Sequence, residues 1–226
     1  MVFAVVPAAG SGRRFGGDLP KQYLQIGSRT VMQWTLDLLT GFSAIREVVV
    51  AVAADDTRAR SLSYRHPAKL RFVTGGAERM DSVLAGLEAL PAEADDWVLV
   101  HDVARPCVPE SDILRLMTEV QSETVGGILA QPVRDTLKQS APDGRHIAVT
   151  VPREGMWQAQ TPQMFRHGLL RHALQRAAAE GIAVTDEASA LEYLGYCPLL
   201  VPGSPRNLKI TWPEDLILAS HLLSHA

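Results

Sequence analysis

The feature that most constrains the fold is an alternation of short apolar runs with longer segments of helical periodicity. Apolar runs with the length of a buried β-strand occupy residues 2–6, 48–53, 97–100 and 127–130. Segments in which apolar residues recur at helical spacing separate them, at 31–39, 80–90 and 113–120. Strands buried on both faces and joined through helices form mainly parallel sheets. We therefore predict an α/β fold with a doubly wound, mainly parallel sheet.

Such a sheet also predicts where a ligand binds. Ligands of open α/β sheets lie beyond the carboxyl ends of the strands. In this chain, that rule selects the loop after Val6, the loop after Val73, and the His101-Asp102 corner after Val100.

Residues 132–155 depart from the alternation. Two strand-like segments, 133–138 and 146–151, flank the turn sequence Ala141-Pro142-Asp143-Gly144. The pattern predicts a β-hairpin inserted into the α/β domain. A lone two-stranded hairpin is marginally stable in water, so its apolar face needs a cover. We expect that cover to be a second copy of the chain, which predicts a homodimer.

The rest of the chain continues the α/β pattern. The sequence predicts a helix over about 165–180, a shorter helix from Asp186 capped by Thr185, strand-like segments at 198–201 and 208–210, and a final helix with a capping box at 211–214. No internal repeat or linker is visible. The economical prediction is a single domain spanning 1–226 with an arm at about 132–155.

Composition excludes several classes of protein. The chain has 22 Lys and Arg against 25 Asp and Glu, a formal charge of −3. This balance disfavours binding to nucleic acid or to a membrane surface. The first apolar run is too short for a membrane helix and follows no basic segment. Cys107 and Cys197 have neither zinc nor disulfide spacing, so we expect buried thiols and a cytoplasmic protein.

The loop after the first strand is rich in small residues and cations. Small side chains at 7–12 let backbone N–H groups approach a ligand closely. A dinucleotide fingerprint fails at Phe15, which disfavours an NAD-dependent oxidoreductase, and a P-loop fails because Lys21 is followed by Gln22. Arg13, Arg14 and Lys21 suit a triphosphate and a displacement at phosphorus. The alternative is a solvated surface turn.

Motifs along nearly the whole chain carry a family resemblance. They are Pro7-Ala8-Ala9-Gly10-x-Gly12-x-Arg14, Pro20-Lys21-Gln22-Tyr23, Gly75-Gly76 with Arg79 and Asp81-Ser82-Val83, His101-Asp102 with Ala104-Arg105-Pro106, Val133-Arg134-Asp135-Thr136, Gln160-Thr161-Pro162-Gln163, Thr185-Asp186-Glu187-Ala188, and Asn207-Leu208-Lys209-Ile210-Thr211 with Pro213-Glu214-Asp215-Leu216. In order and spacing, these motifs resemble the 2-C-methyl-D-erythritol 4-phosphate cytidylyltransferase family.

The resemblance implies a Rossmann-like nucleotidyltransferase fold and a reaction of non-mevalonate isoprenoid biosynthesis. CTP would react with the sugar-alcohol phosphate to give 4-diphosphocytidyl-2-C-methyl-D-erythritol and pyrophosphate, with Mg²⁺ or another divalent cation bound by Asp102. The implied catalytic residues are Arg14, Lys21, Arg153 and Lys209. The implied nucleotide contacts are Ala8, Ala9, Gly10, Gly12, Arg13, Gly76, Ala77, Ser82 and Asp102. The implied substrate contacts are Arg105, Thr136, Arg153, Thr185 and Lys209, of which the arm residues reach the partner's site.

Three positions depart from the family pattern. Ala77 stands where an acidic residue is common, Val103 replaces an alanine, and Pro152 replaces an acidic residue. Two other functions remain open from the residues: a ribitol 5-phosphate cytidylyltransferase and a non-catalytic nucleotide-binding module.

Overall fold

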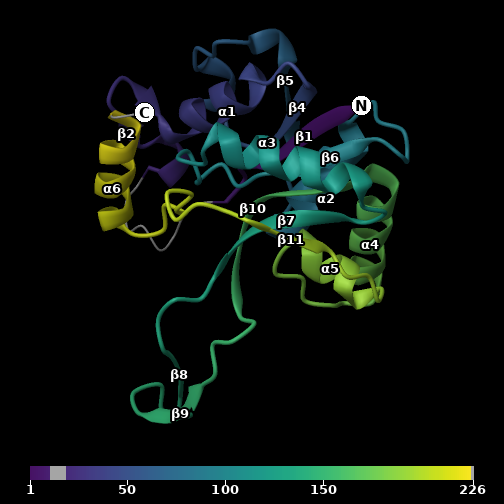
Figure 1. The fold of residues 1–226 in the computed structure, drawn as a ribbon. Helices are drawn as coiled ribbons and strands as arrows, with labels where there is room; N and C mark the ends of the chain where they lie inside the picture. The colour runs from purple at the N-terminus through teal and green to yellow at the C-terminus, as the bar shows by residue number, and fades with distance from the viewer. Residues whose placement is uncertain (11–18, 225–226) are drawn as a thin grey trace.

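A seven-stranded sheet forms the centre of the computed structural model, which describes residues 1–10 and 19–224 (Figure 1). Its strands, in spatial order, are β11 (Leu199–Pro202), β7 (Gly126–Pro132), β10 (Trp157–Arg166), β6 (Trp97–Val100), β1 (Val2–Pro7), β4 (Ile45–Val52) and β5 (Leu70–Thr74). Strand β10 runs antiparallel to both of its neighbours, and the other pairs are parallel. The predicted mainly parallel sheet is confirmed.

Helices cover both faces of this sheet. Buried residues of α1 (Val31–Gly41) and α3 (Glu110–Glu119) pack on one face, together with Ala4 and Val6 of β1. On the other face, Phe3 and Val5 pack with α2 (Arg79–Ala89), α4 (His167–Ala179) and α5 (Glu187–Tyr193). Alternate residues of a fully buried strand thus serve two separate cores, which is the doubly wound arrangement predicted.

Strand β10 is the main element that the sequence did not predict. The predicted helix from about 165 begins at His167, and Phe165 is the strand's penultimate residue. The apolar pattern of a buried strand is missing here. Gln160 and Gln163 are buried, and their side chains make hydrogen bonds to distant segments. Gln160 Nε2 donates to the Ser204 carbonyl at 3.1 Å, and Gln163 Nε2 donates to Asp186 Oδ2 at 2.8 Å.

The start of α5 differs from the prediction by one residue. Asp186, not Thr185, is the N-cap, since its Oδ1 accepts the Ser189 N–H at 3.0 Å. An aspartate carboxylate accepts a backbone N–H bond at the N-cap, and its negative charge also interacts favourably with the positive end of the helix dipole. Thr185 therefore lies one position before the cap, on the exposed side of the turn.

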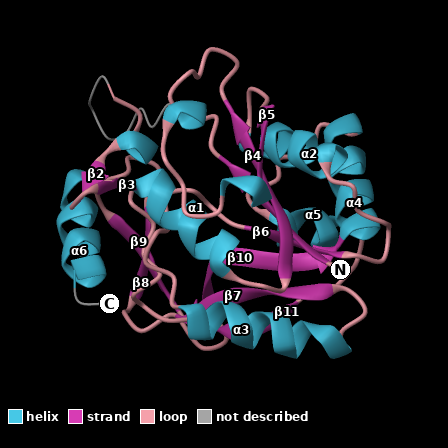
Figure 2. Cartoon of the chain, turned by 90° about the horizontal axis from the view of Figure 1, so that it is seen from above, coloured by secondary structure: helices cyan, strands magenta, loops and turns pink. Residues whose placement is uncertain are grey.

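The segment before α6 (Pro213–Ser224) also corrects two predictions. Residues 208–210 are not a strand, although Ile210 N–H donates to the Ala104 carbonyl at 2.8 Å. The predicted capping box is wrong as well. Asp215 Oδ2, rather than Glu214, accepts the backbone N–H groups of Thr211 and Trp212, both at 2.8 Å. Figure 2 shows α6 beside β2 (Gln25–Ile26) and β3 (Arg29–Thr30), which pair antiparallel.

The predicted hairpin is present as an arm that extends away from the sheet (Figure 1). Its strands are β8 (Leu137–Ser140) and β9 (Ile147–Val151), so β8 begins later than the predicted 133 and β9 begins one residue after the predicted 146. The two strands pair antiparallel in a sheet of their own. Ile147 is 66% exposed and Val149 is 49% exposed, two residues apart on one face.

The two cysteines differ in environment. Cys107 is buried as predicted, whereas Cys197 is exposed, so the prediction for Cys197 is wrong. Among the helices of residues 1–10 and 19–224, none combines the length and the apolar character that crossing a membrane requires.

Candidate active site

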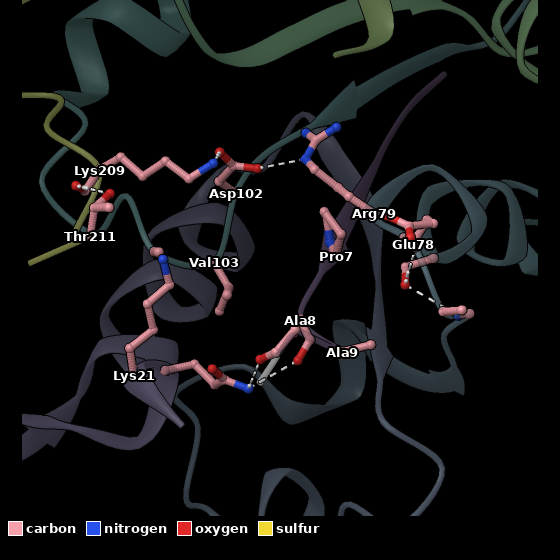
Figure 3. Close-up of a pocket in the computed structure, with 16 residues that line it drawn as sticks. Pro7, Ala8, Ala9, Lys21, Glu78, Arg79, Asp102, Val103, Lys209 and Thr211 are labelled. Atoms are coloured by element: carbon pink, nitrogen blue, oxygen red, sulfur yellow. Dashed lines mark hydrogen bonds and ion pairs between the residues drawn. The ribbon is translucent and has the colours of Figure 1, made fainter. Parts of the chain in front are cut away.

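A cavity of about 290 Å³ lies where the carboxyl ends of β1, β5 and β6 meet (Figure 3). The three loops selected from the sequence all contribute to its wall. Its lining includes Ala8, Ala9, Gly10, Lys21, Gly76, Ala77, Ser82, Asp102 and Lys209, all predicted site residues. Parallel strands bring these loops together because their carboxyl ends share one edge of the sheet.

Asp102 follows β6 and carries the only carboxylate that three cations approach among the described ion pairs. Arg79 Nε lies 3.0 Å from Oδ1, while Lys209 Nζ lies 2.8 Å and Arg105 Nε 3.6 Å from Oδ2. Burial alone would raise the pKa of Asp102, but Arg79 first and then Lys209 hold this pKa well below its usual range. The carboxylate is therefore ionised at neutral pH.

A hydrogen-bonded chain fixes the backbone beneath Asp102. The Asp102 N–H donates to Thr161 Oγ1 at 3.0 Å, and the Thr161 hydroxyl donates to His101 Nδ1 at 3.1 Å. His101 Nε2 then donates to the Arg105 carbonyl at 3.0 Å. Burial lowers the pKa of His101 to about 4, so the ring is neutral and its proton resides on Nε2. This chain ties β6 to β10 at the cavity edge.

The glycine pair after β5 brings the second loop against the first. A Cβ on Gly75 would lie 2.7 Å from Ser82 Oγ and 2.8 Å from the Ala9 Cβ, closer than side chains pack. Ser82 is buried, and its Oγ accepts the Gly76 N–H at 3.2 Å. Glycine is therefore required for the close approach of the loops after β1 and β5, which leaves backbone groups facing the cavity.

Lys21 also lines the cavity, and it lies in a short 3-10 helix, Lys21–Tyr23. Its Nζ donates to the Ile210 carbonyl at 2.7 Å, next to Lys209. The following residue anchors this helix to the first loop, because Gln22 Nε2 donates to the Ala8 carbonyl at 3.0 Å. Figure 3 shows Lys21 and Lys209 entering the cavity from the same side, with Asp102 between Lys209 and Arg79.

Other predicted residues lie elsewhere. Gly12, Arg13 and Arg14 lie outside the described residues. Arg105 is behind the cavity wall, where its Nη1 donates to the Asn207 carbonyl at 2.7 Å. Thr185 is exposed and is not part of the lining.

The two arm residues are not among those that line this chain's own cavity. Thr136 and Arg153 are both exposed, and Arg153 Nη1 donates to the Arg134 carbonyl within the arm. Figure 1 shows the arm projecting from the edge of the body that carries β7 and β10. Any contact of these residues with substrate would have to be made outside this chain's cavity.

Arg79 and Glu187 also belong to the site. Both occur in the motifs given above, but no role was predicted for them from the sequence. Arg79 Nη1 and Nη2 bind Glu187 Oε1 and Oε2 at 2.6 and 3.1 Å, while its Nε binds Asp102. The sequence position of Arg79 could have indicated an anionic partner. Arg79 is the first residue of α2, where the helix dipole disfavours a cation, so a nearby carboxylate is expected to stabilise it.

Divalent cations such as Mg²⁺ take oxygen ligands, and Asp102 offers a carboxylate in the cavity lining. Among the described residues, no group of three or more His, Cys, Asp or Glu could cage a metal ion. Mg²⁺ ordinarily takes one or two carboxylates and completes its shell with water and substrate phosphates. A carboxylate offers about four lone-pair positions. Asp102, ionised and lining the same cavity as Lys21 and Lys209, has the chemistry to hold Mg²⁺ together with substrate phosphates.

Comparison with known proteins identifies the family. The family model described as 2-C-methyl-D-erythritol 4-phosphate cytidylyltransferase matches residues 2–225. A protein of that name from Sodalis glossinidius is 50% identical over 223 residues, covering 99% of this chain and 92% of the relative. Another from Klebsiella pneumoniae is 50% identical over 225 residues, covering 100% of this chain and 94% of the relative.

The fold agrees with this sequence similarity. The crystal structure of the Francisella tularensis 2-C-methyl-D-erythritol 4-phosphate cytidylyltransferase superimposes with a TM-score of 0.85 at 35% identity, covering 98% of this chain and 99% of that one. The predicted nucleotidyltransferase fold is confirmed. The chain therefore belongs to the 2-C-methyl-D-erythritol 4-phosphate cytidylyltransferase family of nucleotidyltransferase enzymes.

Proposed function

We propose that this protein transfers the cytidylyl group of CTP to 2-C-methyl-D-erythritol 4-phosphate, releasing pyrophosphate. The observation that carries the proposal is one cavity that combines close backbone groups, Lys21, and an ionised Asp102 between Lys209 and Arg79. Backbone groups that a ligand can approach closely suit a nucleoside triphosphate. Attack by one anion on another requires cations near the reacting phosphates.

The chemistry balances without a general base. A phosphate oxygen of the sugar-alcohol phosphate attacks the α-phosphorus of CTP. The bond from that phosphorus to the bridging oxygen of the β-phosphate breaks, and pyrophosphate leaves with the electron pair. The nucleophile is already an anion, so no proton has to be removed. Positive charge near the reacting phosphates is therefore the main requirement.

Lys21 and Lys209 supply that charge in the proposal. Lys21 is a compact point charge beside the loop 8–10, where the triphosphate would lie. Lys209, currently on Asp102 Oδ2, would move to the attacking phosphate. Asp102 would hold Mg²⁺, and the bound ion would supply charge that neutralises the triphosphate. Arg14 belongs to the same proposal as a second cation on the transition state.

The cytosine would be recognised mainly by backbone. Gly76, Ala77 and Ser82 line the cavity together with Ala8 and Ala9, and Ser82 Oγ accepts the Gly76 N–H. Ala77 supplies no carboxylate, so only its backbone groups can contact the base. Such recognition needs glycine at 75 and 76 rather than any particular side chain at 77.

Turnover with a choice of substrates tests the function. Pyrophosphate release is measured with CTP and MgCl₂, offering 2-C-methyl-D-erythritol 4-phosphate or ribitol 5-phosphate in parallel. We expect turnover with the first substrate and little with the second. Turnover with ribitol 5-phosphate alone would overturn the proposed substrate, and turnover with neither would favour a non-catalytic nucleotide-binding module.

We also propose that the protein is a homodimer joined through the arm. The arm exposes Ile147 and Val149 on one face, and a two-stranded hairpin with an uncovered apolar face is unstable by itself in water. A second chain would cover this face and receive Thr136 and Arg153 at its cavity. The mild formal charge of −3 favours small-molecule partners over nucleic acid or membrane, and we expect a cytoplasmic enzyme.

Sedimentation and mixed dimers test the arm. Sedimentation at micromolar concentration should give a dimer for the native chain and a monomer for the double variant Ile147→Lys, Val149→Lys. Mixing Arg153→Ala chains with Lys21→Ala chains should restore one intact site per dimer if Arg153 acts in the partner's cavity. Monomers at all concentrations, or no restoration of turnover, would overturn the corresponding part of the proposal.

A further inference from the structure

Asp102 is held by two different kinds of cation. Lys209 is a flexible side chain, 39% exposed, that contacts only Oδ2 of Asp102. Arg79 is more enclosed and contacts Oδ1. If Lys209 leaves for a substrate phosphate, Oδ2 loses its hydrogen bond while Oδ1 keeps its own. Oδ1 therefore stays bound to Arg79, whereas Oδ2 becomes available to another ligand.

Arg79 keeps its position because Glu187 holds the other end of its guanidinium. Glu187 has a side chain only 1% exposed, and both of its oxygens bind the Nη atoms of Arg79. A guanidinium presents donors in a rigid plane, so fixing two nitrogens on Glu187 also fixes the direction of Nε toward Asp102. Glu187 lies in the first turn of α5, 108 residues along the chain from Arg79.

Glu187 also offsets the positive charge of Arg79 beside Asp102. Its side chain is only 1% exposed, so it is too buried to bind the cation itself. Arg105 does not substitute for Arg79, since its Nε lies 3.6 Å from Oδ2 and has no hydrogen-bond partner among the described residues.

We propose that Arg79 and Glu187 are positioning residues that orient the Asp102 carboxylate for the divalent cation, Arg79 directly and Glu187 through Arg79. The inference rests on the proposed function, in which Asp102 binds Mg²⁺. Partners that hydrogen-bond a metal-binding carboxylate commonly contribute roughly 10- to 100-fold to metal affinity. Neither residue needs to touch CTP or the sugar-alcohol phosphate.

The test isolates the contribution of Mg²⁺ to nucleotide binding. The Kd of CTP is measured by calorimetry once in EDTA and once in excess MgCl₂, and the ratio of the two values reports what the cation adds. A merely structural residue would change both Kd values together and leave the ratio intact. Asp102→Asn defines the ratio that remains when the carboxylate is lost.

Arg79→Lys is the main variant, because an ammonium cannot bind both carboxylates as the guanidinium does. We expect its ratio to fall by ~10-fold or more, toward that of Asp102→Asn. Glu187→Gln should lower the ratio in the same direction, and it carries the test if Arg79→Lys does not fold. Arg71→Lys is the matched control, since Arg71 pairs with Glu47 at 2.7 Å outside the cavity.

Two results would overturn the inference in distinguishable ways. If Asp102→Asn keeps the native ratio, the metal role in the proposed function fails and this inference fails with it. If Asp102→Asn lowers the ratio while the folded Arg79 and Glu187 variants keep it, only the positioning role is wrong.

Discussion

The cavity edge of the body and the arm differ in how far apart in the sequence their hydrogen-bonded partners lie. Around Asp102, buried polar groups bond to residues distant in the sequence, as in the bond from the Asp102 N–H to Thr161, although Arg105 Nε has no hydrogen-bond partner among the described residues. In the arm, the bonds are local. Lys138 Nζ donates to Thr150 Oγ1 on the opposite strand at 2.7 Å, and apolar side chains remain uncovered.

The difference shows which part of the protein is complete within one chain. Packing within the body fixes the shape of the cavity before any ligand arrives, because buried polar groups tolerate few alternatives. The arm has a defined hairpin, whose two strands pair only with each other among the described strands. Its shape is local, whereas its proposed contribution to the site depends on a second chain. Substitutions should therefore cost more folding stability in the body than in the arm.

The largest expected difference comes from the same substitution at two glycines. Gly126, at the start of β7, has φ +125°, and an added Cβ would meet the Met164 carbonyl oxygen at 2.1 Å. Gly144, at the arm's turn, has φ +68° with nothing within 4 Å. We expect Gly126→Ala to cost at least ~3 kcal/mol of unfolding free energy and Gly144→Ala about 1 kcal/mol, measured by urea unfolding. Equal costs would break the comparison.

The second difference is in how stability depends on pH. Folded His101 has a pKa of about 4 against 6.5 for the free side chain. Between these values the unfolded chain binds a proton that the folded chain does not, so acidification from pH 7 to 4 should remove about 3 kcal/mol of stability. Glu187 acts in the opposite direction, because burial raises its pKa. His101→Asn isolates the histidine's part of the slope.

The slope is measured by urea unfolding at several pH values, in EDTA. We expect a shallower slope for His101→Asn than for the native chain. A native slope in the His101 variant would show that the buried ring does not set the acid sensitivity of the body.

The third difference is in turnover, and it compares two lysines. Lys21→Ala should lower the rate of the chemical step by at least ~100-fold, about 2.7 kcal/mol, the scale of one lost transition-state contact. Lys138→Ala removes a lysine from the exposed arm and should leave turnover close to native. Single-turnover kinetics with CTP and the sugar-alcohol phosphate provide the measurement. Near-native chemistry in Lys21→Ala would exclude it from catalysis.

Sequence periodicity predicted the elements whose burial is apolar. The strand 97–100 was predicted with its observed bounds, because all four of its residues are apolar and buried. Strand β10 was missed because its Gln160, Thr161 and Gln163 are buried by hydrogen bonds. The partners of those bonds lie between 23 and 60 residues away along the chain, beyond any window of periodicity.

The site residues, too, were predicted correctly where local motifs and strand ends place them, and less well where distant parts of the chain decide their surroundings. Lys21, Asp102 and Lys209 could be selected from the sequence by motif and by position after a strand, and the structure brings them to one cavity. Thr185 was assigned by resemblance, and in this chain it lies outside the cavity lining. Cys197 was expected to be buried from its apolar neighbours, but it is exposed, as is Tyr196, in the loop that precedes β11.

By itself, the sequence determined the doubly wound sheet, the loops that form the site, the hairpin and the family, because apolar periodicity and local motifs are properties of short segments. Only the tertiary structure decided the antiparallel strand in the sheet and the pairing of Arg79 with both Asp102 and Glu187. Buried charges find stability only in specific partners, and the fold alone sets which distant residues become neighbours.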